Sequence, residues 1–133
     1  YYNREDWKGK FIGETKDHEY HLYRKKFGCK KAVKLAKLYV CGMGAFECWI
    51  NGKRVSDHVM EPGWTDFRRT CFYTAYDVSE YFAEGENTEN VILVKLGDCM
   101  FNVPGGRYVY FQRSYGKAKL LCQLDLHQSF SWL

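Results

Sequence analysis

The sequence predicts an all-β fold in which two antiparallel sheets pack face to face as a sandwich. Aromatic residues make up 18 % of the 133 residues, and Tyr, Phe and Trp favour strands over helices. Apolar residues recur at every second position in short runs that end at Gly, Asn or Asp, which is the spacing of strands buried on one face. No long segment between these runs has helical periodicity, so alternating βα units are not expected.

The length and composition fit one folded domain. Chains of this size usually form a single domain and can bury a sizeable core, and hydrophobic residues make up 46 % of the sequence. We interpret residues 1–33 as a lead-in with the first strand or strands, and residues 34–133 as the sandwich domain. The chain begins with Tyr-Tyr-Asn, so we expect it to be a fragment of a larger protein.

The N-terminal half holds the first two predicted strands. Residues 21–27 alternate in polarity and predict a strand that Gly28 ends. Residues 34–41, KLAKLYVC, predict the next strand, before a Gly-Met-Gly break. The expected core residues of this strand are Leu35, Leu38 and Val40.

The clearest local element is a hairpin. Residues 45–50 and 53–55 are rich in strand-forming residues and flank Asn51-Gly52. Both turn residues tolerate the positive φ of a type I′ turn, whose twist matches that of antiparallel strands. An antiparallel pair closed by a two-residue turn is therefore expected.

The remaining chain adds strands and one short helical segment. Residues 77–84 predict one or two helical turns, with Asp77 or Ser79 as N-cap and Gly85 as terminator. Further strands are predicted at residues 70–76, 90–96, 108–111 and 119–126. In total we expect seven or eight strands and no long helix.

Charge and hydropathy argue against two classes of partner. The net charge is +4, and basic residues occur only in short clusters such as Arg68-Arg69, too few for a dominant contact with phosphates. In residues 107–110, Arg and Val alternate with two Tyr as they would in any half-buried strand. No apolar run approaches the roughly 20 residues of a membrane-spanning helix. We expect neither nucleic-acid binding nor a membrane span.

Catalytic and metal-binding motifs are not found in the sequence. Asp57, Asp66, Asp98 and Asp125 could supply a carboxylate pair, but no hydrolase motif and no complete phosphate-binding loop accompanies them. The four His residues have no metal-ligand spacing. We therefore expect no catalytic residue and no metal ligand in this chain.

Six cysteines are present, and no two are spaced as CxxC. Cys41, Cys48 and Cys122 lie in apolar runs, where a thiol behaves as a small core hydrophobe. A chain of this length does not need disulfides to fold, so we interpret the cysteines as free thiols in a reducing, cytoplasmic compartment. The even count also allows three disulfides, which is the alternative.

Trp64, in the sequence PGWTD, leaves two interpretations open. A Trp beside a Gly in a turn-rich segment either plugs the end of a sandwich or offers a flat platform to the apolar face of a sugar. Carboxylates close to it in the sequence would accept hydrogen bonds from sugar hydroxyls.

Residues 36–98 resemble the N-terminal β-sandwich domain of bacterial α-L-rhamnosidases of glycoside hydrolase family 78. The matching pieces are LYV-x-G-x-G-x-F-E-x-x-INGKRV-x-D, PGWTDF, TAYDV, GEN and the final LGD. WKGKFIG and YRKKF before this block, and NVPGGRY and SYGKAKLLCQLDL after it, fit the same group, so the resemblance covers about nine-tenths of the chain.

The resemblance implies a jelly-roll-like β-sandwich, similar to galactose-binding domains, that serves as a non-catalytic accessory domain for substrate recognition. It implies that catalysis resides in a separate (α/α)6 barrel of the parent chain, where two acidic residues hydrolyse terminal α-L-rhamnosides with inversion. In some members such a sandwich binds L-rhamnose with calcium, so the resemblance implies calcium as a possible ligand. No other cofactor is expected.

If the domain binds a carbohydrate, Trp64 would stack on the sugar and nearby polar side chains would bond its hydroxyls. The candidate polar residues are Asp57, Asp66, Asp98, Asn102 and Arg107. Many relatives have Gly-Trp-Tyr or Gly-Phe-Tyr after the strand that ends in Leu-Gly, where this chain has residues 98–101, DCMF. A second stacking residue is therefore not expected there. The alternative is a purely structural domain that packs on the catalytic barrel and binds no ligand.

Overall fold

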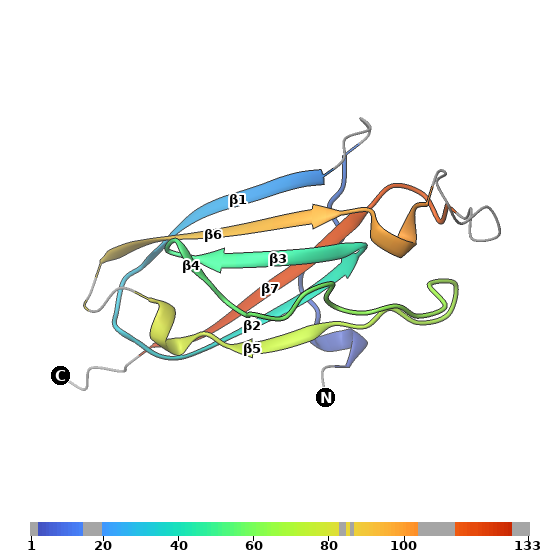
Figure 1. Ribbon diagram of the computed structural model, residues 1–133. Helices are drawn as coiled ribbons and strands as arrows, with labels where there is room; N and C mark the ends of the chain where they lie inside the picture. Colours follow the sequence, from blue (N-terminus) through green and yellow to red (C-terminus); the bar gives the residue numbers. More distant parts are fainter. Residues whose placement is uncertain (1–2, 15–19, 83–84, 86, 104–113, 129–133) are drawn as a thin grey trace.

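Figure 1 shows the computed structural model, which describes residues 3–14, 20–82, 85, 87–103 and 114–128. Within these residues the chain forms seven strands: β1 (Tyr20–Cys29), β2 (Val33–Met43), β3 (Ala45–Ile50), β4 (Lys53–Arg54), β5 (Thr74–Asp77), β6 (Thr88–Gly97) and β7 (Lys119–Gln128). Three single-turn 3-10 helices accompany them: η1 (Arg4–Asp6), η2 (Ser79–Tyr81) and η3 (Cys99–Phe101). None of the described helices has the length and apolarity to cross a bilayer.

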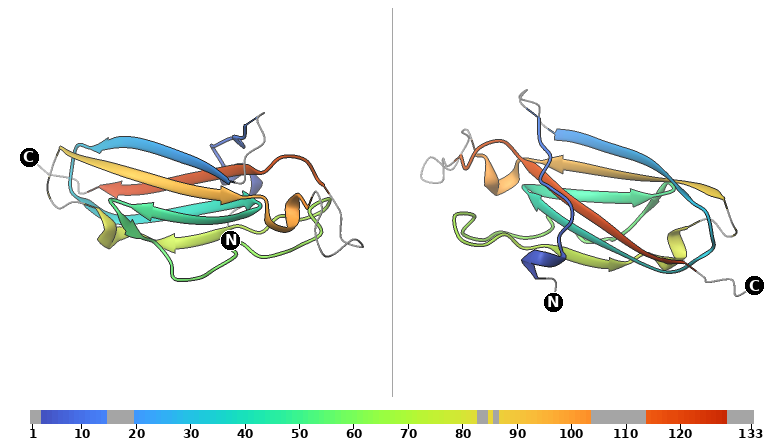
Figure 2. Two further views of the ribbon diagram at one scale, coloured as in Figure 1. Left: turned by 45° about the horizontal axis from the view of Figure 1, so that its top comes forward. Right: turned by 180° about the vertical axis from the view of Figure 1, so that it is seen from behind.

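The strands form two antiparallel sheets that lie one over the other (Figures 1 and 2). The first sheet has the order β1-β6-β3-β4, and the second has the order β5-β2-β7. β6 and β3 are the inner strands of the first sheet, and β2 is the inner strand of the second. β6 pairs with β1 along its whole length, and β2 pairs with β7 in the same way. The predicted all-β antiparallel sandwich is confirmed.

Alternate residues of the strands build the core between the sheets. On β3, Phe46, Cys48 and Ile50 point inward and are at most 3 % exposed, whereas Glu47 and Trp49 between them are partly exposed. This alternation is the period of two on which the strand predictions depend. The core residues of the facing strands are Ala36, Leu38 and Val40 of β2, Val94 and Leu96 of β6, and Leu120 of β7.

One predicted core position in β2 is wrong. Leu35 is 36 % exposed, and Ala36 is fully buried. Because side chains alternate along a strand, Ala36 is in phase with Leu38 and Val40, whereas Leu35 points to the other face. The pairing of β2 with β7 also shifts register between Val33 and Leu35.

Three predicted boundaries differ from the structure. β1 continues through Gly28, which pairs with Glu89 of β6, so this glycine does not end the strand. The strand predicted at residues 70–76 is reduced to β5, because the amides of Arg69 and Thr70 donate to the carbonyl of Asp66 and form a turn before it. The helical segment predicted at residues 77–84 is described only as η2. The strand predicted at residues 108–111 lies outside the described residues.

The predicted hairpin is confirmed, and its turn residue Asn51 does more than close it. Asn51 and Gly52 have φ values of 50° and 80°, as a type I′ turn requires. The Asn51 side-chain amide donates to the carbonyl of Tyr81 at 2.9 Å and to Oδ1 of Asn90 at 2.8 Å. Its Oδ1 accepts from the amide of Val91 at 2.9 Å. One side chain thus joins the β3–β4 turn to η2 and β6.

Candidate functional site

The segment between β4 and β5, residues 55–73 (the 55–73 connection), carries three of the candidate sugar-binding residues. It passes beside β3, where the amide of Phe46 donates to the carbonyl of Glu61 at 2.9 Å. It then extends to the end of the sandwich at which η3 also lies (Figure 1). The connection therefore has an inner part next to β3 and an outer part at the sandwich end.

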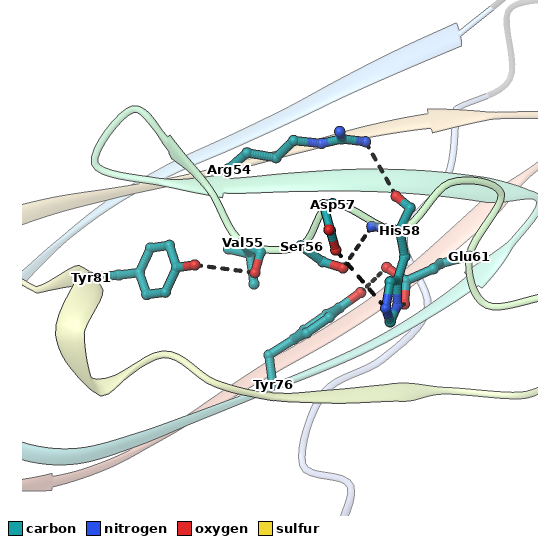
Figure 3. A network of polar contacts seen from close by, with 8 residues as sticks. All are labelled: Arg54, Val55, Ser56, Asp57, His58, Glu61, Tyr76 and Tyr81. Atoms are coloured by element: carbon teal, nitrogen blue, oxygen red, sulfur yellow. Dashed lines mark hydrogen bonds and ion pairs between the residues drawn. The ribbon is translucent and has the colours of Figure 1, made fainter.

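A polar network around His58 organises the inner part (Figure 3). His58 Nδ1 lies 3.2 Å from Glu61 Oε1, and His58 Nε2 lies 4.0 Å from Asp57 Oδ1. The His58 amide donates to Ser56 Oγ at 3.1 Å, and Arg54 Nη2 donates to the His58 carbonyl at 3.2 Å. These bonds fold residues 54–61 into a compact turn.

Glu61 has the least exposed charged side chain of this network. Its side chain is 13 % exposed and accepts a hydrogen bond from the Tyr76 hydroxyl of β5. Burial of the Tyr76 ring and this bond to Glu61 raise the pKa of Tyr76 above its ordinary value. The Glu61 carboxylate therefore holds the connection against β5, whereas the Asp57 side chain is fully exposed to solvent.

At the sandwich end, aromatic packing joins the outer part of the connection to η3. The Phe67 ring packs edge-on against Phe101, with centroids 5.1 Å apart, and against Tyr115 at 5.6 Å. Directly beside Phe101, Asn102 Nδ2 donates to Asp98 Oδ2 at 2.8 Å. This packing places the Asp98–Asn102 pair at the same end as the turn that contains Phe67.

Trp64 and Asp66 lie in that outer part. Asp66 binds the Arg68 guanidinium through two hydrogen bonds, Oδ1 to Nε at 2.8 Å and Oδ2 to Nη2 at 2.9 Å. Trp64, two residues before Asp66, is 60 % exposed. An indole exposed to this extent favours the platform interpretation over the plug, because a plug would be buried.

The structure thus brings four candidates to one end and separates a fifth. Trp64 and Asp66 precede Phe67 in the outer part of the connection, and Phe67 packs on Phe101, which lies between Asp98 and Asn102 in the chain. Asp57 instead borders a cleft of about 530 Å³ beside β5, which is also lined by Tyr76 and Tyr81. Arg107 lies outside the described residues.

The carboxylates at the sandwich end are bonded to nitrogen donors and are not grouped around a cation site. Asp66 binds a guanidinium and Asp98 binds an amide. Among the residues that the structure describes, no three His, Cys, Asp or Glu side chains come close enough together to hold a metal ion.

Sequence reasoning missed several residues that shape this region. The spacing of Asp66 and Arg68, two residues apart in a turn, could have indicated their ion pair. The partnership of Phe67 with Phe101 and Tyr115 had no sequence indication, because it joins segments far apart in the chain. The bond between Glu61 and Tyr76 was also missed, although Glu61 directly precedes the PGWTD sequence.

Comparisons with known proteins agree on one group of enzymes. Residues 31–130 match the family model described as the alpha-L-rhamnosidase N-terminal domain. An alpha-L-rhamnosidase of Formosa agariphila is 32 % identical over 139 aligned positions, which cover 93 % of this chain and 14 % of that protein. An alpha-L-rhamnosidase of Streptomyces avermitilis is 39 % identical over 70 residues, covering 53 % of this chain and 6 % of that protein.

Solved structures give the same result for the fold. The native α-L-rhamnosidase of Aspergillus terreus superimposes with a TM-score of 0.81 and 30 % identity, over 96 % of this chain and 15 % of that one. The α-L-rhamnosidase of Dictyoglomus thermophilum gives a TM-score of 0.74 and 31 % identity, over 98 % and 16 % of the two chains. The Streptomyces avermitilis enzyme complexed with L-rhamnose gives 0.69 and 30 %, over 84 % of this chain and 10 % of that chain. This chain therefore spans at most 16 % of the length of these proteins.

Proposed function

The chain belongs to the family of α-L-rhamnosidase N-terminal domains, and from this premise we propose that it is the non-catalytic substrate-recognition domain of an α-L-rhamnosidase. In this proposal the domain binds the terminal L-rhamnose of a glycan or glycoside. Hydrolysis takes place elsewhere in the parent chain, on an (α/α)6 barrel that uses two acidic residues and inverts the anomeric centre.

The observation that carries the proposal is the arrangement at the sandwich end. An indole that is 60 % exposed stands two residues from Asp66, and the Asp98–Asn102 pair lies at the same end. Sugar-binding surfaces commonly combine one aromatic face with a few fixed polar groups, since the ring covers the apolar face of the sugar and the polar groups orient its hydroxyls.

Each residue has a definite role in this proposal. Trp64 stacks on the sugar ring, and Asp98 and Asn102 exchange hydrogen bonds with its hydroxyls. Asp66 is already bonded to Arg68, so it acts mainly by fixing the turn that follows Trp64. Arg107 stays a prediction from the sequence. Asp57 borders a separate cleft and is the candidate that the proposal uses least.

A second role, packing against the rest of the parent chain, has an observation of its own. A cleft of about 740 Å³ opens between the edge strands β1 and β7 and is lined mainly by apolar side chains. Leu22 and Ile12 at this cleft are 57 % and 50 % exposed. Exposed apolar surface of this kind marks contact sites between domains, and this surface does not include the sandwich end.

Calorimetric titration of the chain with millimolar L-rhamnose tests the proposal, first without and then with calcium. We expect saturable heat with L-rhamnose and none with D-galactose. Trp64→Ala should weaken binding about tenfold or more, because a stacked indole contributes on the order of 1.5 kcal/mol. Phe72→Ala is the matched control, since Phe72 lies in the same connection and is 52 % exposed.

Three outcomes would contradict the proposal. Absence of heat under both conditions would remove sugar recognition and leave the packing role. Equal affinity of the Trp64→Ala variant and the wild type for L-rhamnose would show that the sugar does not bind at Trp64. Hydrolysis of an aryl α-L-rhamnoside by the chain alone would contradict a non-catalytic domain.

A further inference from the structure

Two thiols on the outer face of the β5-β2-β7 sheet have no part in the function proposed above. Cys41 lies on β2 and Cys71 lies near the end of the 55–73 connection. Their sulfur atoms are 3.4 Å apart, and both cysteines are free. A disulfide bond is about 2.05 Å long, so the two sulfurs need to approach by only about 1.4 Å to be joined.

We propose that Cys41 and Cys71 form an oxidation site, in which Cys71 reacts first with a small anionic disulfide and Cys41 then completes an intramolecular bond.

Accessibility sets the order of the two steps. Cys71 is partly exposed, whereas Cys41 is 5 % exposed. Both line a cleft of about 690 Å³ on this face of the sheet. A reagent that enters the cleft therefore reaches Cys71, and the sulfur behind it belongs to Cys41.

The charge of the cleft selects the reagent. Arg4, Lys10, Arg68 and Arg69 line it, and no described lining residue carries a carboxylate. Arg68 is paired with Asp66, which lies outside the lining. The other three cations form no ion pair with any described residue. Reactive thiols are found in partly exposed, electropositive surroundings of this kind, and such surroundings attract anions.

The contact between the two sulfurs shifts their pKa values in opposite directions, and these shifts agree with the order set by accessibility. A hydrogen bond from the Cys41 thiol lowers the pKa of Cys71. The same bond, together with burial, raises the pKa of Cys41. The thiolate, which is the nucleophile in disulfide exchange, therefore forms on the accessible residue.

The small disulfide is the oxidant in this reaction, and it accepts the two electrons that the protein thiols lose. The Cys71 thiolate attacks one sulfur of the small disulfide, its S–S bond breaks, and one thiolate leaves. Cys41 then loses its proton to solvent and attacks the Cys71 sulfur of the mixed disulfide, which releases the second thiolate. The two protein thiols are oxidised by two electrons, and the reagent is reduced to two thiols.

The bond would fix the connection that carries Trp64 and Asp66. Cys41 and Cys71 are 30 residues apart in the chain, and a loop of that length closed by a disulfide stabilises a small domain enough to raise Tm by roughly 10 °C. The inference does not depend on sugar binding, because it concerns only the two thiols and their cleft.

The test uses the chain with Cys99→Ser, because Cys99 is exposed and would react by itself. This background is treated with oxidised glutathione, which is anionic, or with cystamine, which is cationic, at equal concentration. Remaining thiols are blocked, and mass spectrometry of the digested protein identifies the products. Cys41→Ala and Cys71→Ser are made in the same background.

We expect the Cys41–Cys71 disulfide to form at least about tenfold faster with oxidised glutathione than with cystamine. Cys41→Ala should retain glutathione on Cys71, and Cys71→Ser should show neither the adduct nor the rise in Tm. A stable glutathione adduct on Cys71 with Cys41 still reduced would overturn the pairing. A first adduct on Cys41 would overturn the order, and equal rates with the two reagents would overturn the role of the cations.

Discussion

The side chain of Asn51 offers a sharp test of how the hairpin is attached to the rest of the sandwich. Asn51→Gly keeps the positive φ of the turn at no steric cost, so the hairpin itself should survive. It removes the bonds to the Tyr81 carbonyl, to Asn90 Oδ1 and from the Val91 amide. The change therefore separates the turn geometry from the contacts that the turn residue makes.

The expected loss follows from the count of bonds. Three hydrogen bonds at about 1 kcal/mol each give about 3 kcal/mol of unfolding free energy. An unfolding entropy of about 2.1 cal/mol/K per residue amounts to about 0.28 kcal/mol/K for 133 residues. The Tm of Asn51→Gly should therefore fall by about 11 °C, measured by circular dichroism or calorimetry.

Asn87→Gly is the matched control for this prediction. Asn87 also has positive φ, at 55°, and it is exposed. Its backbone amide donates to the Lys30 carbonyl, and this bond does not need the side chain. We expect its Tm to change by less than about 2 °C. If the two variants lost the same stability, the reasoning from the Asn51 contacts would be refuted.

Three further predictions concern stability and its pH dependence. Gly44→Ala should lower the free energy of unfolding by at least about 3 kcal/mol, because an added Cβ at φ 134° would lie 2.2 Å from the Gly97 carbonyl oxygen. In Gly52→Ala the added Cβ meets no neighbouring atom, so this control should lose only about 1 kcal/mol in the same denaturant titrations. The raised pKa of Tyr76 means that the unfolded chain loses this proton first, so stability should fall as pH rises above about 10; Tyr76→Phe should show a smaller fall, and an unchanged alkaline profile would contradict the assignment. Hydrogen bonds from the Ser79 hydroxyl and amide lower the pKa of Asp77, so it stabilises the fold at pH above about 4; this contribution should disappear as pH falls further, and Asp77→Asn should show a weaker acid dependence in the same titration.

The strand pattern was predictable where a run alternates over its whole length. The hairpin around Asn51-Gly52 and the apolar run of β6 follow from local composition, because turn chemistry and side-chain alternation are properties of neighbouring residues. The core prediction for Leu35 was wrong because it rested on the apolar side chain alone. Leu35 is an odd number of residues from Leu38, so the two side chains point to opposite faces of the strand. The strand start before β5 was wrong because the turn at Asp66 is set by hydrogen bonds that the pattern does not show.

The candidate site was predictable only in part, for a related reason. Trp64 and Asp98 stand out by their positions beside Gly-rich or strand-end segments. What brings them to one end is the packing of Phe67 on Phe101 and Tyr115, which depends on the tertiary fold. The separation of Asp57 from the other candidates has the same origin, since the bridge from Phe46 to Glu61 holds the inner part of the connection beside β3.

Amide and indole N–H spectra of the ¹⁵N-labelled chain, recorded with increasing L-rhamnose, test sugar recognition at the sandwich end most directly. At about 10 mM sugar, enough to populate a millimolar site, the indole N–H of Trp64, the side-chain amide of Asn102 and the backbone amide of Asp98 should shift together along one binding curve. Spectra that do not change, or shifts confined to β1 and β7 at the apolar cleft, would contradict a rhamnose-recognition role.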